Sequence, residues 1–197
     1  MDHAEGVEFY GLMCEALSPS VDCFLAETMS SVEEASQAVE AAGTLPKPLR
    51  RPMMVSFTLN SRGSVRSEEA VTDAIPRIVA RAEKHHVHLC GVLFNCAEPE
   101  SISEAFRQIH SDAHLQRLLK EKSIKIGAYA NRLTPVPDNW TMAESEAAQP
   151  MRDDLSPNDY FEKFVRVWVK DFGVQIVGGC CGITPQHIAY LRSHLDQ

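Results

Sequence analysis

The segment VGGCCGITPQHI, residues 177–188, places two adjacent cysteines between glycines and directly before a helix signal. Neighbouring side chains on an extended strand point to opposite faces, so Cys180 and Cys181 can converge only where the backbone leaves the strand conformation. The glycines of the segment favour this change, because glycine tolerates positive φ angles and close approach of other groups. The segment therefore predicts a strand-to-helix turn at which two thiols meet.

Outward from this segment, short apolar runs alternate with helical patterns along the whole chain. One further helical pattern, VEFYGLMCEALSPS, precedes the first apolar run. Strands that alternate with helices in this way imply a parallel sheet with right-handed crossovers, which is an α/β fold. The apolar runs predict five buried strands, at residues 21–28, 51–59, 87–96, 123–131 and 173–179.

Several local signals predict where the helices begin and end. Ser31 with Glu34 forms a capping box, and Gly43 is the expected stop of that helix. Pro76 is expected to kink or divide the helix that follows the second strand. Residues 98–122 read as one continuous helix, and the polar, proline-containing stretch 133–155 as a long loop of functional or disordered character.

Composition limits the classes of protein to which the chain can belong. Its 197 residues are 44% hydrophobic and carry a net charge of -8, which is typical of one globular domain and argues against nucleic-acid binding. The start of the chain has no signal-peptide pattern, and no apolar run is long enough to span a membrane. We therefore expect one domain over residues 1–197, located in the cytoplasm, with no membrane partner.

The six cysteines are expected to be reduced thiols that bind a metal or pack in the core, since no secretory signal is visible. Cys14, Cys23 and Cys90 lie within predicted helix or strand interiors and are interpreted as core residues. Cys96 lies at the end of the third predicted strand, and the adjacent pair Cys180 and Cys181 follows the fifth. The second group is therefore the candidate for chemistry.

In a parallel sheet all strand carboxyl ends meet at one rim, where such folds keep their active sites. Glu27 and Asn131 are expected at the same rim as the three thiols. The third and fifth strands would be next-but-one neighbours, about 9 to 10 Å apart, a gap that sheet curvature and side-chain length can close. Three cysteine ligands leave one tetrahedral position of a zinc ion open, which is typical of catalytic zinc.

These motifs resemble the homocysteine S-methyltransferase family. The resemblance rests on Asn-Cys-x-x-Pro at residues 95–99, GGCCG-x-TP-x-HI at the last strand end, and FLAETMSSVEEA with Glu-Thr at a strand end, and it extends from about residue 8 to the C-terminus. It implies a TIM-type (β/α) barrel of which this chain carries about five of eight βα units.

The resemblance also implies a reaction. Zinc would be bound by Cys96, Cys180 and Cys181, the sulfur of homocysteine would occupy the open position, and Glu27 would hold the substrate's amino group. The methyl donor would be a sulfonium or ammonium compound such as S-methylmethionine, S-adenosylmethionine or betaine, and the product would be methionine.

The chain departs from the family pattern at its beginning, because the opening Asp-Gly-Gly strand end and the next two strands are absent. The resemblance therefore identifies an N-terminally truncated or partial member, whose exposed sheet edges favour self-association. Two alternatives stay open: a non-catalytic chain that binds zinc or regulates a partner, and a redox sensor that uses the adjacent thiols of Cys180 and Cys181.

Overall fold

The computed structural model describes residues 2–134 and 150–195. Most of the loop predicted for residues 133–155 lies outside these ranges, so its character stays a prediction.

The described residues form an α/β fold around one parallel sheet, as the alternating pattern predicts. The strands are hydrogen-bonded in chain order, and the third and fifth are next-but-one neighbours, as expected. No pairing joins the first strand to the fifth among the described residues, so the sheet is an open arc. The strands are β1 (Phe24–Met29), β2 (Met53–Phe57), β3 (Leu89–Asn95), β4 (Lys125–Tyr129) and β5 (Ile176–Val177).

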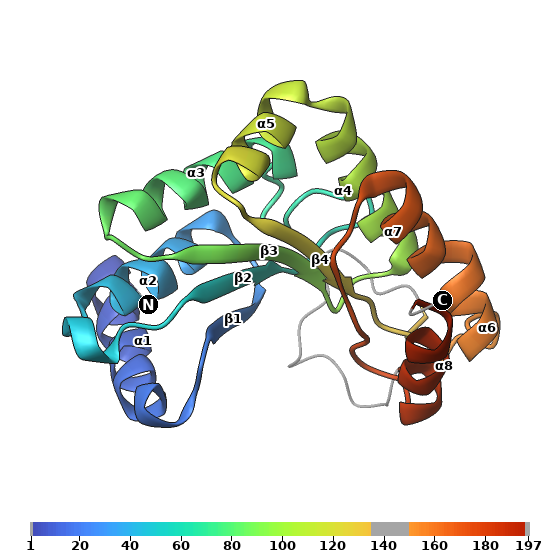
Figure 1. Cartoon of the computed structure of the whole chain (residues 1–197), viewed down its shortest axis with the longest axis horizontal. Helices are drawn as coiled ribbons and strands as arrows, with labels where there is room; N and C mark the ends of the chain where they lie inside the picture. Colours follow the sequence, from blue (N-terminus) through green and yellow to red (C-terminus); the bar gives the residue numbers. More distant parts are fainter. Residues whose placement is uncertain (1, 135–149, 196–197) are drawn as a thin grey trace.

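The helices lie along the convex side of the curved sheet (Figure 1). Apolar side chains of the two layers form the core, in which Phe94 of β3 meets Phe106 with ring centroids 5.5 Å apart. None of the helices in the described ranges is long and apolar enough to cross a membrane. They are α1 (His3–Leu17), α2 (Val32–Thr44), α3 (Val71–Lys84), α4 (Pro99–Ser111), α5 (Ala113–Glu121), α6 (Pro157–Tyr160), a π-helical turn (Phe161–Val165), α7 (Arg166–Phe172) and α8 (Pro185–Leu195).

The capping box predicted for α2 is present only in part. The Ser31 hydroxyl accepts the backbone N–H of Glu34 at 3.1 Å, as expected, but the Glu34 carboxylate accepts the N–H of Ser30 at 2.8 Å. The helix runs one residue beyond Gly43 and ends at Thr44. The backbone N–H groups of Glu34 and Ser30 therefore both have acceptors. The second bond of the capping box goes to Ser30 instead of to Ser31.

Pro76 lies inside α3 and does not divide it, since the helix runs unbroken from Val71 to Lys84, whereas the kink stays a prediction. The other helix prediction is wrong. Residues 98–122 do not form one helix, because α4 ends just before Asp112 and α5 begins just after it. The Asp112 carboxylate accepts the N–H groups of His114 and Leu115 at 2.9 Å each, so it caps the new helix and stabilises the break.

Candidate metal centre

Backbone hydrogen bonds bring the cysteine segments together at the carboxyl ends of β3, β4 and β5. The N–H of Cys96, the residue after β3, donates to the carbonyl of Tyr129 at 3.4 Å. The N–H of Cys180 donates to the carbonyl of Ala130 at 2.8 Å, and the carbonyl of Cys181 accepts the N–H of Arg132 at 2.7 Å. The chain after β4 therefore lies between the two cysteine segments and holds both in register.

The three sulfur atoms form a compact cluster, all within 4.8 Å of one another. The Sγ atom of Cys181 lies 3.6 Å from that of Cys96 and 3.8 Å from that of Cys180. Three thiolates around a tetrahedral zinc at about 2.3 Å would be about 3.8 Å apart. The spacing and the all-thiol donor set both fit a zinc ion with its fourth position open to solvent, since Cys181 is exposed.

The three thiols differ in acidity because they lie so close to one another. Hydrogen bonding from the Cys96 thiol lowers the pKa of Cys180 to about 6. The same interaction, together with burial, raises the pKa of Cys96 well above its ordinary value, and burial raises that of Cys181. One thiolate among three close sulfurs is an arrangement that favours a cation at the centre of the group.

Two glycines explain how adjacent thiols converge. Gly182 has a φ of 80°, in the left-handed region that glycine favours, and a Cβ there would lie 2.5 Å from the sulfur of Met151. A Cβ at Gly179 would overlap the side chain of Ile183. Gly178 has an ordinary φ and room for a Cβ, so conformational freedom does not explain it. Cys96 itself has a φ of 50°, which sequence reasoning did not predict.

Two buried side chains that sequence reasoning did not single out support the cysteine turn. The Tyr160 hydroxyl donates to the carbonyl of Gly178 at 2.9 Å and accepts the N–H of Ala130 at 3.3 Å. The Nδ1 atom of His187 accepts the N–H of Thr184 at 3.2 Å, so its Nε2–H donates to the carbonyl of Leu155 at 3.0 Å. These bonds fix the turn on both sides, and the histidine belongs to the TP-x-HI part of the motif.

A third buried side chain, Asn95, links the ends of the first three strands. Its Nδ2 donates to the hydroxyl of Thr28 at 2.7 Å, and its Oδ1 accepts the Ser56 hydroxyl at 2.7 Å and the N–H of Thr28 at 3.2 Å. Because Asn95 directly precedes Cys96, this network fixes the approach of the first thiol to the cluster.

Glu27 lies on β1 but does not end it, since the strand continues to Met29. A register shift between Ala26 and Met29 leaves Glu27 and Thr28 in a bulge, where Thr28 has a φ of 60°. Bulges often re-aim side chains near sites. Glu27 is exposed, and its negative charge acts electrostatically on both Cys180 and Tyr129.

The hydroxyl of Tyr129, at the end of β4, is buried, with the side chains of Ser56 and Glu27 as its polar neighbours. Burial raises its pKa, and the nearby Glu27 carboxylate raises it further. Asn131, the other predicted rim residue, follows the carboxyl end of β4 and lies in a turn, in which its Oδ1 accepts the N–H of Leu133 at 3.1 Å.

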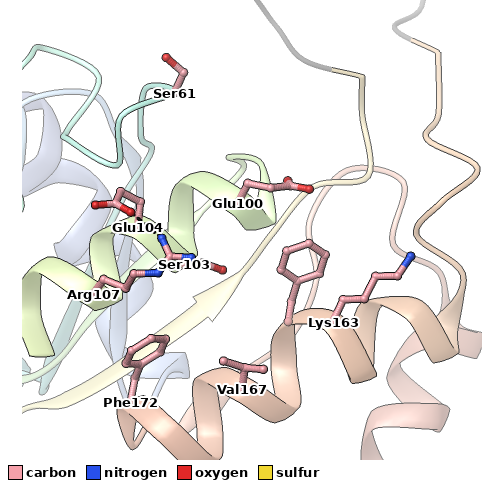
Figure 2. Close-up of a pocket in the computed structure, with 9 residues that line it drawn as sticks. Ser61, Glu100, Ser103, Glu104, Arg107, Lys163, Val167 and Phe172 are labelled. Carbon is pink, nitrogen blue, oxygen red and sulfur yellow. Dashed lines mark hydrogen bonds and ion pairs between the residues drawn. The ribbon is translucent and has the colours of Figure 1, made fainter.

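A separate groove of about 380 Å³ lies between α4 and the α6–α7 stretch. Figure 2 shows Glu104 and Arg107 of α4 on one side of it and Lys163 and Phe172 on the other. None of the three clustered cysteines lines this groove, and neither does Glu27. It is therefore not part of the candidate metal centre.

Comparisons with known proteins connect these residues to a family. The model of the homocysteine S-methyltransferase family matches residues 1–195. Methionine synthase of Mycobacterium leprae is 27% identical over 175 residues, which are 87% of this chain and 12% of that protein. Homocysteine S-methyltransferase 1 of Arabidopsis thaliana is 23% identical over 176 residues, which are 89% of this chain and 47% of that protein. The chain thus spans less than half the length of either relative.

A solved structure, the arginine decarboxylase of Paramecium bursaria Chlorella virus, aligns with a TM-score of 0.41 and 12% identity over 89% of this chain and 61% of that one.

Proposed function

The chain belongs to the homocysteine S-methyltransferase family, and on that premise we propose that it takes part in methyl transfer from a sulfonium or ammonium donor to the thiol of homocysteine, giving methionine. The observation that carries the proposal is the cluster of Cys96, Cys180 and Cys181, whose sulfurs lie within 4.8 Å of one another. Donors of the proposed class are S-methylmethionine, S-adenosylmethionine and betaine.

The three cysteines are the proposed zinc ligands. Zinc bound there would supply a Lewis acid that deprotonates a substrate thiol at neutral pH. The chain's own contribution is positional: Asn95, Tyr160 and His187 hold the cysteine segments before substrate arrives. Preorganised ligands of this kind make the open position specific for one incoming donor atom.

Glu27 is the proposed partner of the homocysteine ammonium group. Its exposed carboxylate acts electrostatically on Cys180, which supports its being close enough to hold a substrate bound at the cluster. The buried hydroxyl of Tyr129 lies near the same carboxylate and adds a polar group at this position. An ammonium group between Glu27 and the cluster would orient the substrate thiol toward the metal.

The open sheet is proposed to be an arc of a TIM-type barrel, with about five of its eight βα units in this chain. Five parallel strands in chain order, all with helices on the convex side, support that interpretation (Figure 1). The concave face would then line the barrel interior. Leu25 of β1 is 42% exposed, which leaves apolar surface uncovered.

Self-association would cover this surface, and the proposed partner is a second copy of the chain. Edge strands β1 and β5 run in the same direction, so the β1 edge of one copy can pair in parallel with the β5 edge of another. Helix α1, which packs on α2, exposes a stripe of apolar side chains at helical spacing, namely Phe9, Leu12, Met13 and Leu17. We expect Leu12→Glu to reduce self-association in analytical ultracentrifugation, whereas Glu8→Gln on the same helix would leave it unchanged.

The zinc content of the purified, reduced chain tests the proposed site, and a methyl-transfer assay tests the activity. We expect one zinc per chain in the wild type, loss of zinc in Cys181→Ser, and methionine formation from homocysteine with at least one of the three donors. Glu27→Gln should raise the KM for homocysteine and leave zinc content unchanged.

The alternatives predict other results. One zinc per chain with no methyl transfer from any donor would favour a non-catalytic zinc-binding or regulatory chain. Absence of zinc together with a Cys180–Cys181 disulfide after mild oxidation would favour a redox sensor. Either result would refute the proposed activity.

A further inference from the structure

A second pair of thiols lies at the opposite end of the sheet. Cys23 directly precedes β1, and Cys90 is the second residue of β3, so both belong to the amino ends of the parallel strands. Their sulfur atoms are 3.9 Å apart, although the residues are 67 positions apart in the sequence. Both side chains are half-buried rather than buried. The interpretation of Cys23 and Cys90 as core residues is therefore wrong, whereas Cys14 is buried as expected.

An irregularity of the sheet places Cys90 in this position. Met53 of β2 pairs with Leu89, and Met54 pairs with Gly91, so Cys90 has no partner on β2. A bulge of this kind re-aims the side chain of the extra residue. The Cys90 thiol donates to the carbonyl of Met53 at 3.4 Å, and the Cys23 thiol donates to the carbonyl of Phe24 at 3.2 Å.

The distance between the sulfurs distinguishes two chemistries. A disulfide requires about 2.05 Å between its sulfurs, and the sulfurs of Cys23 and Cys90 lie 3.9 Å apart. Two sulfurs that share one metal ion at about 2.3 Å lie about 3.8 Å apart at a tetrahedral angle and about 4.6 Å apart in the linear arrangement that two ligands favour. The observed 3.9 Å falls within this range, so rotation of the two side chains is enough to place an ion between the sulfurs.

The reactivity of the pair also disfavours a redox role. Burial, followed by the neighbouring Cys90, raises the pKa of Cys23 to about 11. The thiolate is the form that attacks oxidants and disulfides, so a protonated thiol reacts slowly at neutral pH. A metal ion can still displace the protons, because its binding free energy offsets the cost of deprotonation.

We propose that Cys23 and Cys90 form a second metal site, which binds one soft monovalent ion of the copper(I) class through two thiolates. Soft sulfur ligands select such ions. Within residues 2–134 and 150–195, the only group of three or more potential ligands is the rim cluster, so the pair offers just two donors. Zinc, which requires four ligands in closed protein sites, would be held weakly there. Binding forms two metal–sulfur bonds and releases the two thiol protons without any change of oxidation state.

Copper(I) titration of the full-length, zinc-loaded chain tests the site. The titration is done anaerobically with a chromogenic copper(I) chelator as competitor. Because the three rim thiols can also bind this soft ion, we expect the wild type and Cys14→Ser, the matched control that removes a lone buried thiol, to bind one copper(I) more than Cys23→Ser or Cys90→Ser. Added to Cys96→Ser/Cys180→Ser/Cys181→Ser, Cys23→Ser and Cys90→Ser should each weaken binding by at least tenfold, with circular dichroism checking that the variants fold.

A second variant separates this site from the rim. Cys96→Ser/Cys180→Ser/Cys181→Ser removes the rim cluster and should still bind one copper(I). Loss of all copper binding in this folded variant, or equal binding by wild type and Cys23→Ser, would overturn the proposal. So would formation of a Cys23–Cys90 disulfide on mild peroxide treatment, seen as a two-dalton mass loss in that same variant, because the pair would then be a redox couple.

Discussion

The two ends of one sheet carry thiol groups that differ in how they are built. At the carboxyl rim, a turn with Gly182 at a φ of 80° brings a third sulfur to the cluster, and buried Tyr160 and His187 hold that turn. At the amino end, a bulge at Cys90 brings only two sulfurs together, with weak bonds to backbone carbonyls as support. Strand geometry alone thus brings two thiols together, whereas a third thiol requires a turn that buried side chains hold in place.

The largest difference is expected between the loss of a rim thiol and the loss of a thiol of the amino-end pair. We expect Cys181→Ser to abolish stoichiometric zinc and reduce methyl transfer by more than about a hundredfold, since loss of a ligand exceeds the effect of losing its outer-shell support. Cys23→Ser should retain zinc and activity within about twofold, because it does not contact the rim. Elemental analysis and initial rates measure both. A similar loss in the two variants would contradict the assignment of the rim cluster.

Reactivity toward iodoacetamide sharpens the same contrast in the metal-free, reduced chain. The pKa of Cys180 is lowered to about 6 and that of Cys23 is raised to about 11. Only thiolates react, so alkylation of Cys180 should rise between pH 5 and 7 and then level off, while alkylation of Cys23 should still be rising at pH 10.

At pH 7 the thiolate fractions of these two cysteines differ by about 10⁴-fold, and the weaker nucleophilicity of the more acidic thiolate reduces the difference in rate to about fiftyfold. Pulse alkylation followed by mass spectrometry measures both profiles. Coincident profiles would mean that hydrogen bonding at the rim does not lower the Cys180 pKa.

Much of the fold and the rim cluster follows from sequence, because parallel strands bring their carboxyl ends to one edge wherever the curvature lies. The proximity of Cys96 to the pair Cys180–Cys181 is therefore predictable from their positions at strand ends. The contact between Cys23 and Cys90 is not, since it depends on a one-residue bulge and on curvature across β2. The support from Tyr160 is equally hidden, because a tyrosine in an amphipathic helix is usually a core residue.

The support that Tyr160 gives to the cysteine turn provides the third prediction. Tyr160→Phe removes the hydroxyl and leaves the carbonyl of Gly178 and the N–H of Ala130 unpaired in a buried place. We expect a loss of about 1 to 3 kcal/mol in the free energy of unfolding and about tenfold weaker zinc binding. Urea unfolding and zinc competition with a chelator measure the two effects.

Tyr10→Phe is the control for Tyr160→Phe, because it removes a hydroxyl bonded to Glu34 in the first turn of α2 rather than to the cysteine turn. It should leave zinc affinity unchanged. Equal zinc affinity in both variants would show that the turn holds its shape without Tyr160.

The smallest effect is expected from the backbone of the turn itself. Gly182→Ala should cost about 1 to 2 kcal/mol of unfolding free energy, because an L-residue is strained at a φ of 80°. Gly178→Ala is the matched control, since its added Cβ would meet only Tyr129 at 3.4 Å and its φ is ordinary. If chemical denaturation shows equal losses for the two variants, the left-handed turn is not what brings the third sulfur to the rim. If only Gly182→Ala loses both unfolding free energy and bound zinc, the turn explains why the rim has three clustered thiols and the amino end has two.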